Sequence, residues 1–132
     1  SEQEKEMTTF AEIYDCCMAL KGTEETFPFD EETLVFKVAG KMFALCGVDT
    51  NPPRVNVKCD PERAITLREE HDAITPGYHM NKKHWNTLIC DGRLEAGFVA
   101  ELIQDSYELV VAGLTRKARA ELEEREEGGE ES

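Results

Sequence analysis

The chain has 132 residues, which is room for one domain of ordinary size and excludes a multidomain enzyme or a long repeat array. Its hydrophobic content of 40% excludes a chain that is disordered throughout. No apolar run approaches the ~20 residues that cross a bilayer, and residues 1–7 are charged. We therefore expect a cytoplasmic protein that makes no membrane contact.

The net charge of −13 is distributed unevenly along the chain. Residues 1–32 carry −8, residues 33–94 carry +2 and residues 95–132 carry −7. A protein that binds phosphates by releasing counterions needs clustered lysines and arginines, so any contact with nucleic acid is expected from the middle segment. Residues 121–132 contain seven glutamates and one arginine, which predicts a disordered acidic tail.

The cysteines form an odd set with no CxxC pair, which argues against a disulfide framework and against a structural zinc site. They are Cys16, Cys17, Cys46, Cys59 and Cys90. The clustered soft ligands are His79, His84 and Cys90, whereas a zinc site uses three or four such ligands. We expect reduced and mostly buried thiols, no metal and no cofactor.

The first expected element is an amphipathic helix. Thr9 and Glu12 have the spacing of a capping box, and apolar residues then recur at steps of three and four as far as Gly22. Residues 22–32 contain Pro28 among acidic residues, so we expect a loop there that tucks Phe27 and Phe29 under the domain.

A β-hairpin is expected next, because residues 33–38 and 41–48 are rich in β-formers and flank Ala39-Gly40. A two-residue turn sets Val38 opposite Lys41, Phe36 opposite Phe43 and Leu34 opposite Leu45. Residues 54–59 then alternate cleanly, with Arg54, Asn56 and Lys58 on the face opposite the valines. The pattern predicts an antiparallel meander with one apolar face and one mixed, basic face.

The rest of the chain adds helices and one further strand. Asp60 with Pro61 is a helix start, residues 74–83 are rich in turns, and residues 84–90 read as a strand. A longer helix ends near Gly113, and Thr115 caps a last charged helix. We therefore predict an α+β two-layer sandwich, an antiparallel sheet packed against helices, with one domain over residues 1–120 and the tail beyond it.

Residues 76–87, PGYHMNKKHWNT, form the most unusual stretch of the sequence. One interpretation is structural, with Trp85 and Tyr78 anchoring a loop and a strand to the core. A second is an anion site, in which Lys82, Lys83 and His79 join Lys37, Arg54 and Lys58. A third is catalytic, with His79 or His84 as an acid or base, although no nucleophile or carboxylate stands at a recognisable spacing beside them.

Several blocks of this sequence resemble the MmcQ/YjbR family of small bacterial proteins. They are FPF at 27–29, TLVFKV at 33–38, GKMFA at 40–44, VNVKCDP at 55–61, residues 76–87, and SYELV at 106–110. The likeness extends over about residues 10–119. It implies a two-layer fold similar to CyaY-like and type III secretion chaperone-like domains, described for the family as a double-wing DNA-binding motif.

The resemblance and the basic residues together predict a non-enzymatic protein that contacts DNA weakly through the polar sheet face and residues 78–86. The expected contact residues are Lys37, Lys41, Arg54, Asn56, Lys58, Tyr78, His79, Asn81, Lys82, Lys83, His84 and Asn86. The alternative is a protein-interaction module that receives a partner segment in an apolar groove or at a sheet edge.

Overall fold

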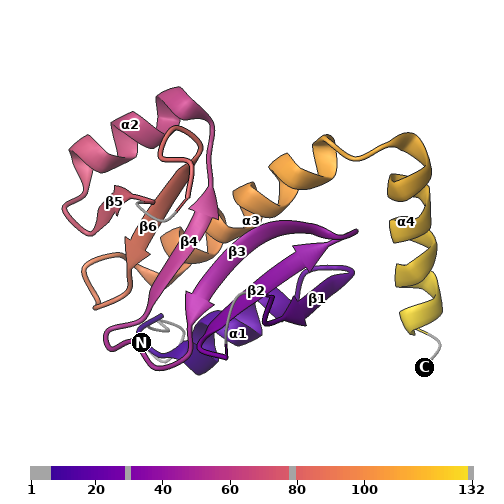
Figure 1. The fold of residues 1–132 in the computed structure, drawn as a ribbon, viewed down its shortest axis with the longest axis horizontal. Helices are drawn as coiled ribbons and strands as arrows, with labels where there is room; N and C mark the ends of the chain where they lie inside the picture. Colours follow the sequence, from indigo (N-terminus) through magenta and orange to yellow (C-terminus); the bar gives the residue numbers. More distant parts are fainter. Residues whose placement is uncertain (1–6, 29–30, 78–79, 131–132) are drawn as a thin grey trace.

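The computed structural model of the protein describes residues 7–28, 31–77 and 80–130, with side chains as far as residue 124. The elements in chain order are α1 (Phe10–Met18), β1 (Thr23–Thr26), β2 (Thr33–Val38), β3 (Lys41–Gly47), β4 (Arg54–Lys58), α2 (Pro61–Glu70), β5 (Ile74–Pro76), β6 (Trp85–Ile89), α3 (Ala96–Ala112) and α4 (Arg116–Glu130). The strands form one six-stranded antiparallel sheet in the order β1-β2-β3-β4-β6-β5 (Figure 1).

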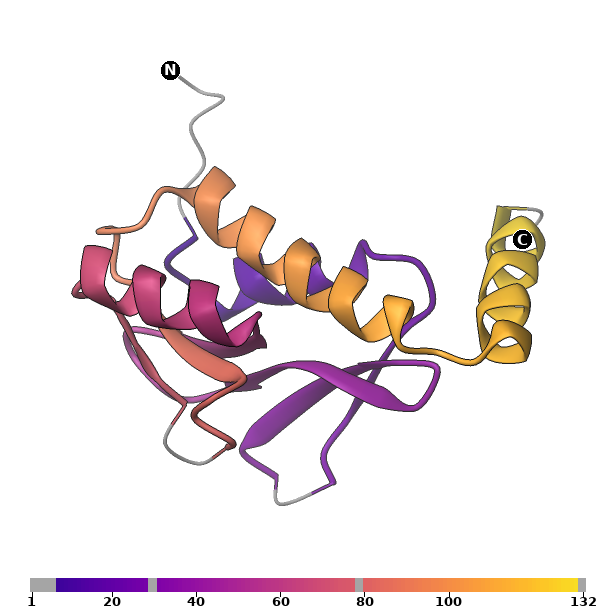
Figure 2. The same cartoon turned by 90° about the horizontal axis from the view of Figure 1, so that it is seen from above.

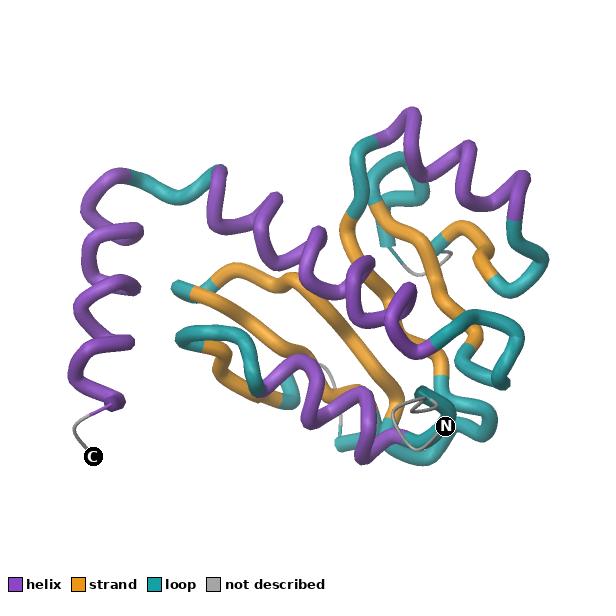
Figure 3. The backbone as a smooth tube through the Cα atoms, turned by 180° about the vertical axis from the view of Figure 1, so that it is seen from behind, coloured by secondary structure: helices purple, strands orange, loops and turns teal. Residues whose placement is uncertain are grey.

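The helices α1, α2 and α3 cover one face of this sheet (Figures 2 and 3). The main core lies between the two layers, and its largest fully buried side chains include Phe36, Phe43, Ile13, Leu88 and Ile103. The expected α+β sandwich is confirmed. None of the described helices covers the other face, which we call the open face (Figure 2).

The helix starts follow the capping signals of the sequence. Thr9 and Glu12 form a capping box at α1, with the Thr9 hydroxyl accepting the Glu12 N–H at 3.2 Å. The Asp60 carboxylate accepts the N–H groups of Glu62 and Arg63 at the start of α2. The Thr115 hydroxyl accepts the Ala118 N–H at 3.0 Å, as expected for the cap of α4.

The hairpin of β2 and β3 has the predicted turn but not the predicted register. Ala39 and Gly40 have φ values of 52° and 79°, which suit a tight two-residue turn, and Val38 lies opposite Lys41. Beyond that pair a bulge skips Phe43, so that Phe36 lies opposite Ala44 and Leu34 opposite Cys46. The predicted pairings of Phe36 with Phe43 and of Leu34 with Leu45 are therefore wrong.

The bulge also changes which face each β3 side chain occupies. Phe43 and Ala44 both belong to the main core, and Leu45 turns to the open face, where it joins Val35 and Trp85 in a second, smaller core. The sequence pattern placed Leu45 with Phe43 because strict alternation assumes that no residue is inserted.

Two short strands were not expected from the sequence. β1 occupies part of the predicted loop over residues 22–32, and β5 occupies part of the turn-rich segment over residues 74–83. Both are edge strands.

The predicted packing of Phe27 and Phe29 under the domain is only partly testable. Phe27 is 47% exposed, so the prediction is wrong for Phe27, and Phe29 lies outside the described residues.

The last helix extends past the predicted start of the tail. α4 runs to Glu130 and stands beside the two layers (Figure 2). Its Leu122 is 5% exposed and contacts Gly22, where a Cβ atom would lie 2.2 Å from the Leu122 Cδ1 atom. The disorder of residues 121–132 and the domain boundary at residue 120 stay predictions. Among the described helices, none is long and apolar enough to span a membrane.

The Ser106 hydroxyl joins α3 to the sheet where β3 and β4 separate. It donates to the carbonyl of the bulged Phe43 at 2.6 Å and accepts the Lys58 N–H at 2.8 Å. The hydrogen-bond ladder between β3 and β4 ends at the pair of Ala44 and Val57. The Phe43 carbonyl and the Lys58 N–H lie past that end, and the fully buried Ser106 supplies the hydrogen-bond partner of both groups.

We expect Ser106→Ala to lower the free energy of unfolding by about 2–4 kcal/mol, because it leaves two shielded backbone groups without a partner. Urea unfolding followed by circular dichroism measures this. Thr66→Ala is the control, since the Thr66 hydroxyl donates to the Glu62 carbonyl on the exposed side of α2. Equal losses in the two variants would contradict the bridging role.

The second core predicts the effect of removing the one tryptophan. Trp85 is 7% exposed and groups with Val35 and Leu45, with Met42 and Met80 packed against them. We expect Trp85→Ala to lower the free energy of unfolding by ~3–5 kcal/mol, as for other large deletions in a core, with Trp85→Phe losing much less. An unchanged melting temperature of the alanine variant would show that the open-face core is not structural.

Candidate nucleic-acid interface

Two lysines share one end of the open face. Lys37 lies near the end of β2 and Lys58 at the end of β4, and both alternate with valines that belong to the main core. β2 and β4 run in the same direction on either side of β3, so both lysines lie toward the same end of the sheet, although β3 and β4 are no longer paired at Lys58. Lys58 lies opposite Trp85, the first residue of β6, so the turn that precedes β6 meets the same end.

The turn over residues 81–84 brings two further lysines to this end. Asn81 organises it: its side-chain oxygen accepts the Lys83 N–H at 2.9 Å, and its carbonyl accepts the N–H groups of His84 and Trp85. The His84 carbonyl accepts the Cys59 N–H at 2.7 Å, which fixes the turn beside the end of β4. Lys82 and Lys83 are both exposed. We call Lys37, Lys58, Lys82 and Lys83 the lysine end.

Arg68 of α2 holds this turn from the helix side. Its Nη1 atom donates to the Lys82 carbonyl at 3.1 Å and to the Asn86 Oδ1 atom at 2.9 Å. Arg68 was not among the predicted contact residues, because its bonds join residues 14 and 18 positions apart along the chain. A basic residue in the last turn of a helix was the one available signal.

Other predicted contact residues lie elsewhere. Asn86 pairs with Val57, is 1% exposed and donates to the Ala64 carbonyl beneath α2, so it is not part of the open face. Arg54 is exposed on the open face but four residues along β4 from Lys58, about 13 Å away. Lys41 lies opposite Val38, a core residue, and so is on the side of the helices.

The remaining predicted residues lie at the centre of the open face, in the turn before β6, or outside the described residues. Asn56 lies at the centre, half-buried, and its Oδ1 atom accepts the Thr87 hydroxyl at 2.5 Å. Asn81 is exposed in the turn, and His84 is half-buried. Tyr78 and His79 lie outside the described residues.

Acidic groups oppose the lysine end. Glu24 lies opposite Lys37 on β1, and such cross-strand pairs of opposite charge attract each other.

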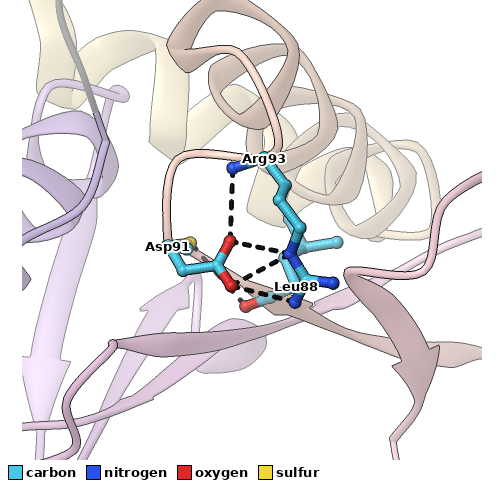
Figure 4. A network of polar contacts seen from close by, with 4 residues as sticks. Leu88, Asp91 and Arg93 are labelled. Atoms are coloured by element: carbon cyan, nitrogen blue, oxygen red, sulfur yellow. Dashed lines mark hydrogen bonds and ion pairs between the residues drawn. The ribbon is translucent and has the colours of Figure 1, made fainter.

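Two arginines away from the lysine end are paired with nearby carboxylates. Arg93 donates to Asp91 in the turn after β6, where its side chain lowers the Asp91 pKa (Figure 4), and Arg63 donates to Asp105 at 2.6 Å.

A cavity of about 290 Å³ lies on the other side of the sheet, between α2 and α3. Its floor is formed by residues of β4 and β6, including Val57 and Leu88. No histidine is among its described lining residues, so it lends no support to the hypothesis of a catalytic pocket at His79 and His84. Within the described residues, no group of three or more potential metal ligands comes together.

Comparisons with known proteins match one family. The model of the YjbR family matches residues 18–109. YjbR of Escherichia coli K12 is 34% identical over 84% of this chain and 94% of its own, and YbdF of Escherichia coli O157:H7 is 37% identical over 76% and 82%. These two relatives are uncharacterised proteins.

Solved structures show the same fold. A Deinococcus radiodurans protein with the DUF419 domain is 44% identical, with a TM-score of 0.84 over 90% of this chain and 91% of its own. A Pseudomonas syringae protein is 28% identical, with a TM-score of 0.66 over 76% and 97%. The two-layer arrangement of helices on an antiparallel sheet is therefore shared with experimentally determined structures.

Proposed function

The chain belongs to the YjbR family, and from its surface we propose that it binds duplex DNA, weakly and without sequence preference, through the lysine end of the open face. The observation that supports this proposal is that the turn carrying Lys82 and Lys83 lies beside Lys58 at the end of β4, with Lys37 toward the same end of the open face on β2. We propose a binding role without a catalytic step and a cytoplasmic location.

The balance of charges supports weak, salt-sensitive binding. Neutralising about four phosphates gives a slope near −3.6 for log affinity against log salt concentration. Glu24 opposes the lysines on the open face, and Glu121, Glu123 and Glu124 flank Leu122, which anchors α4 beside Gly22. Because the Debye length is about 8 Å at physiological salt, these acids repel phosphates only at close range.

Base stacking adds little to the proposed contact. Trp85 is 7% exposed within the second core, so its indole ring is not available to a base. Asn56 and Asn81 are uncharged hydrogen-bonding groups on the same side as the lysines, and such side chains contact phosphate and sugar oxygens. Contacts of this kind position a protein on a duplex without reading its sequence.

Reversing two charges tests the proposal. We expect the double variant Lys82→Glu and Lys83→Glu to bind a fluorescein-labelled duplex of 20 base pairs about tenfold or more weakly at 20 mM NaCl. Its salt slope should be smaller by about two, because two phosphate contacts are lost. Fluorescence anisotropy between 20 and 150 mM NaCl measures both quantities.

A charge-matched control distinguishes the loss of the lysine end from the general effect of a more negative net charge. Arg116→Glu with Lys117→Glu makes the same change in net charge on exposed residues of α4. We expect this variant to keep its affinity within about threefold. Equal losses in the two variants, or no loss in either, would contradict binding through the lysine end.

A protein-interaction role is the second candidate, and the cavity between α2 and α3 favours it. The exposed apolar side chain of Leu109 lies at its edge, 42% exposed. Apolar grooves on helix layers receive apolar side chains of partner segments. This role is independent of the lysine end, because the cavity lies on the opposite side of the sheet.

A further inference from the structure

The α2–α3 groove, meaning the cavity between these helices and its open mouth, has an apolar floor and one apolar wall. Val57, Leu88 and Leu102 form the floor, with Leu67 from α2 beside them. The wall continues along α3 through Leu109 and Ala112, which are both exposed. With a volume of about 290 Å³ the groove holds one or two large apolar side chains.

The rim of the groove is acidic. Asp60, Asp105 and Glu108 line it, and Glu101 lies one turn before Asp105 on α3. The lining arginine is already engaged: Arg63 Nη1 lies 2.6 Å from the Asp105 carboxylate and its Nη2 atom lies 3.8 Å from that of Glu101. The hydrogen bond to Asp105 raises the pKa of Arg63, and one guanidinium thus offsets part of the charge of two rim carboxylates.

Two other cations near the groove do not offset these acids. Lys58 borders the groove, but its side chain alternates with Val57 and belongs to the open face. Arg119 of α4 donates to the carbonyls of Val111 and Ala112, which are orphan acceptors at the end of α3. The mouth of the groove therefore presents net negative charge around an apolar floor.

We propose that the α2–α3 groove docks an apolar side chain of a partner protein segment, with lysines or arginines beside it that meet the acidic rim. The proposal rests on the protein-interaction role above and does not require the chain to bind DNA. Charge complementarity selects the partner: an acidic segment is repelled by Glu101, Asp105 and Glu108, whereas a basic one is attracted.

The probe is an acetylated and amidated 15-residue helical peptide with a stripe of leucines flanked by lysines. A matched peptide has glutamates in place of the lysines. Titration of the ¹⁵N-labelled protein, followed by heteronuclear NMR, is expected to shift amide signals of α2 and α3 with the lysine peptide. The glutamate peptide should bind about tenfold or more weakly.

Paired variants locate the contact. Leu109→Ser should weaken binding of the lysine peptide about fivefold or more, because an exposed anchor of the groove is lost. Ile65→Ser is the matched control, since Ile65 is 50% exposed on the same helix layer but does not line the groove. Glu108→Lys should weaken binding similarly, and Glu70→Lys, on the exposed end of α2, should not.

Several outcomes would overturn the proposal. Absence of shifts at millimolar peptide, or equal binding of the two peptides, contradicts a groove for basic segments. Shifts confined to β1 or β5 would keep a protein-interaction role but move it to a sheet edge. Shifts that depend on protein concentration without peptide would assign the groove to a second copy of the chain.

The peptide experiment and the DNA experiment test the two proposals independently of each other. The variant with Lys82→Glu and Lys83→Glu should keep its affinity for the lysine peptide within about twofold, because both lysines lie outside the groove lining. If the peptide binds and the duplex does not, the DNA proposal alone is contradicted. If the duplex binds and the peptide does not, the groove proposal alone is contradicted.

Discussion

The hydroxyl of Ser106 closes the gap between β3 and β4 at the point where Phe43 bulges out of register. It meets a carbonyl and an N–H that face each other too far apart to pair directly, and it comes from the middle of α3. This one side chain thus fixes the position of α3 on the sheet and the position of the last residues of β4. Both surfaces depend on this point, because Lys58 turns to the open face and Cys59 to the groove.

Near that point, lysines gather on the open face and carboxylates gather around the groove on the helix side. The open face collects lysines from β2, β4 and the turn before β6, whereas the helix side surrounds an apolar groove with carboxylates from α2 and α3. For a chain with a net charge of −13, the proposed phosphate contact requires that the cations be locally separated from the acids. The sheet places the carboxylates of the groove on the face away from the lysines, because successive side chains point to opposite faces, whereas Glu24 stays beside Lys37.

Much of the fold was predictable where the signal is local. Thr9, Asp60 and Thr115 each cap a helix, and the alternation of residues 54–58 placed Arg54, Asn56 and Lys58 on one face. The bulge at Phe43 was not predictable, because it is stabilised by Ser106, which is 63 residues away. The edge strands β1 and β5 have only four and three residues, which is too short for a periodic pattern to mark them.

The candidate sites were harder to predict from the sequence than the fold, because they depend more strongly on tertiary contacts. The sequence selected Asn86 as a surface residue because of its polar neighbours, yet hydrogen bonds to Arg68 and Ala64 explain how it is buried without penalty. The α2–α3 groove joins Arg63 to Asp105, which are 42 residues apart, and no sequence spacing relates them. By contrast, the lysine end contains four of the residues that composition and alternation had selected.

The most direct test of the proposed DNA-binding surface is an NMR titration of the ¹⁵N-labelled protein with an unlabelled duplex of 12 base pairs at low salt. The account predicts that the amide signals of Lys37, Lys58 and residues 81–84 shift in proportion to bound duplex and return when salt is added. Shifts confined to α2 and α3, or a spectrum unchanged at saturating duplex, would contradict it.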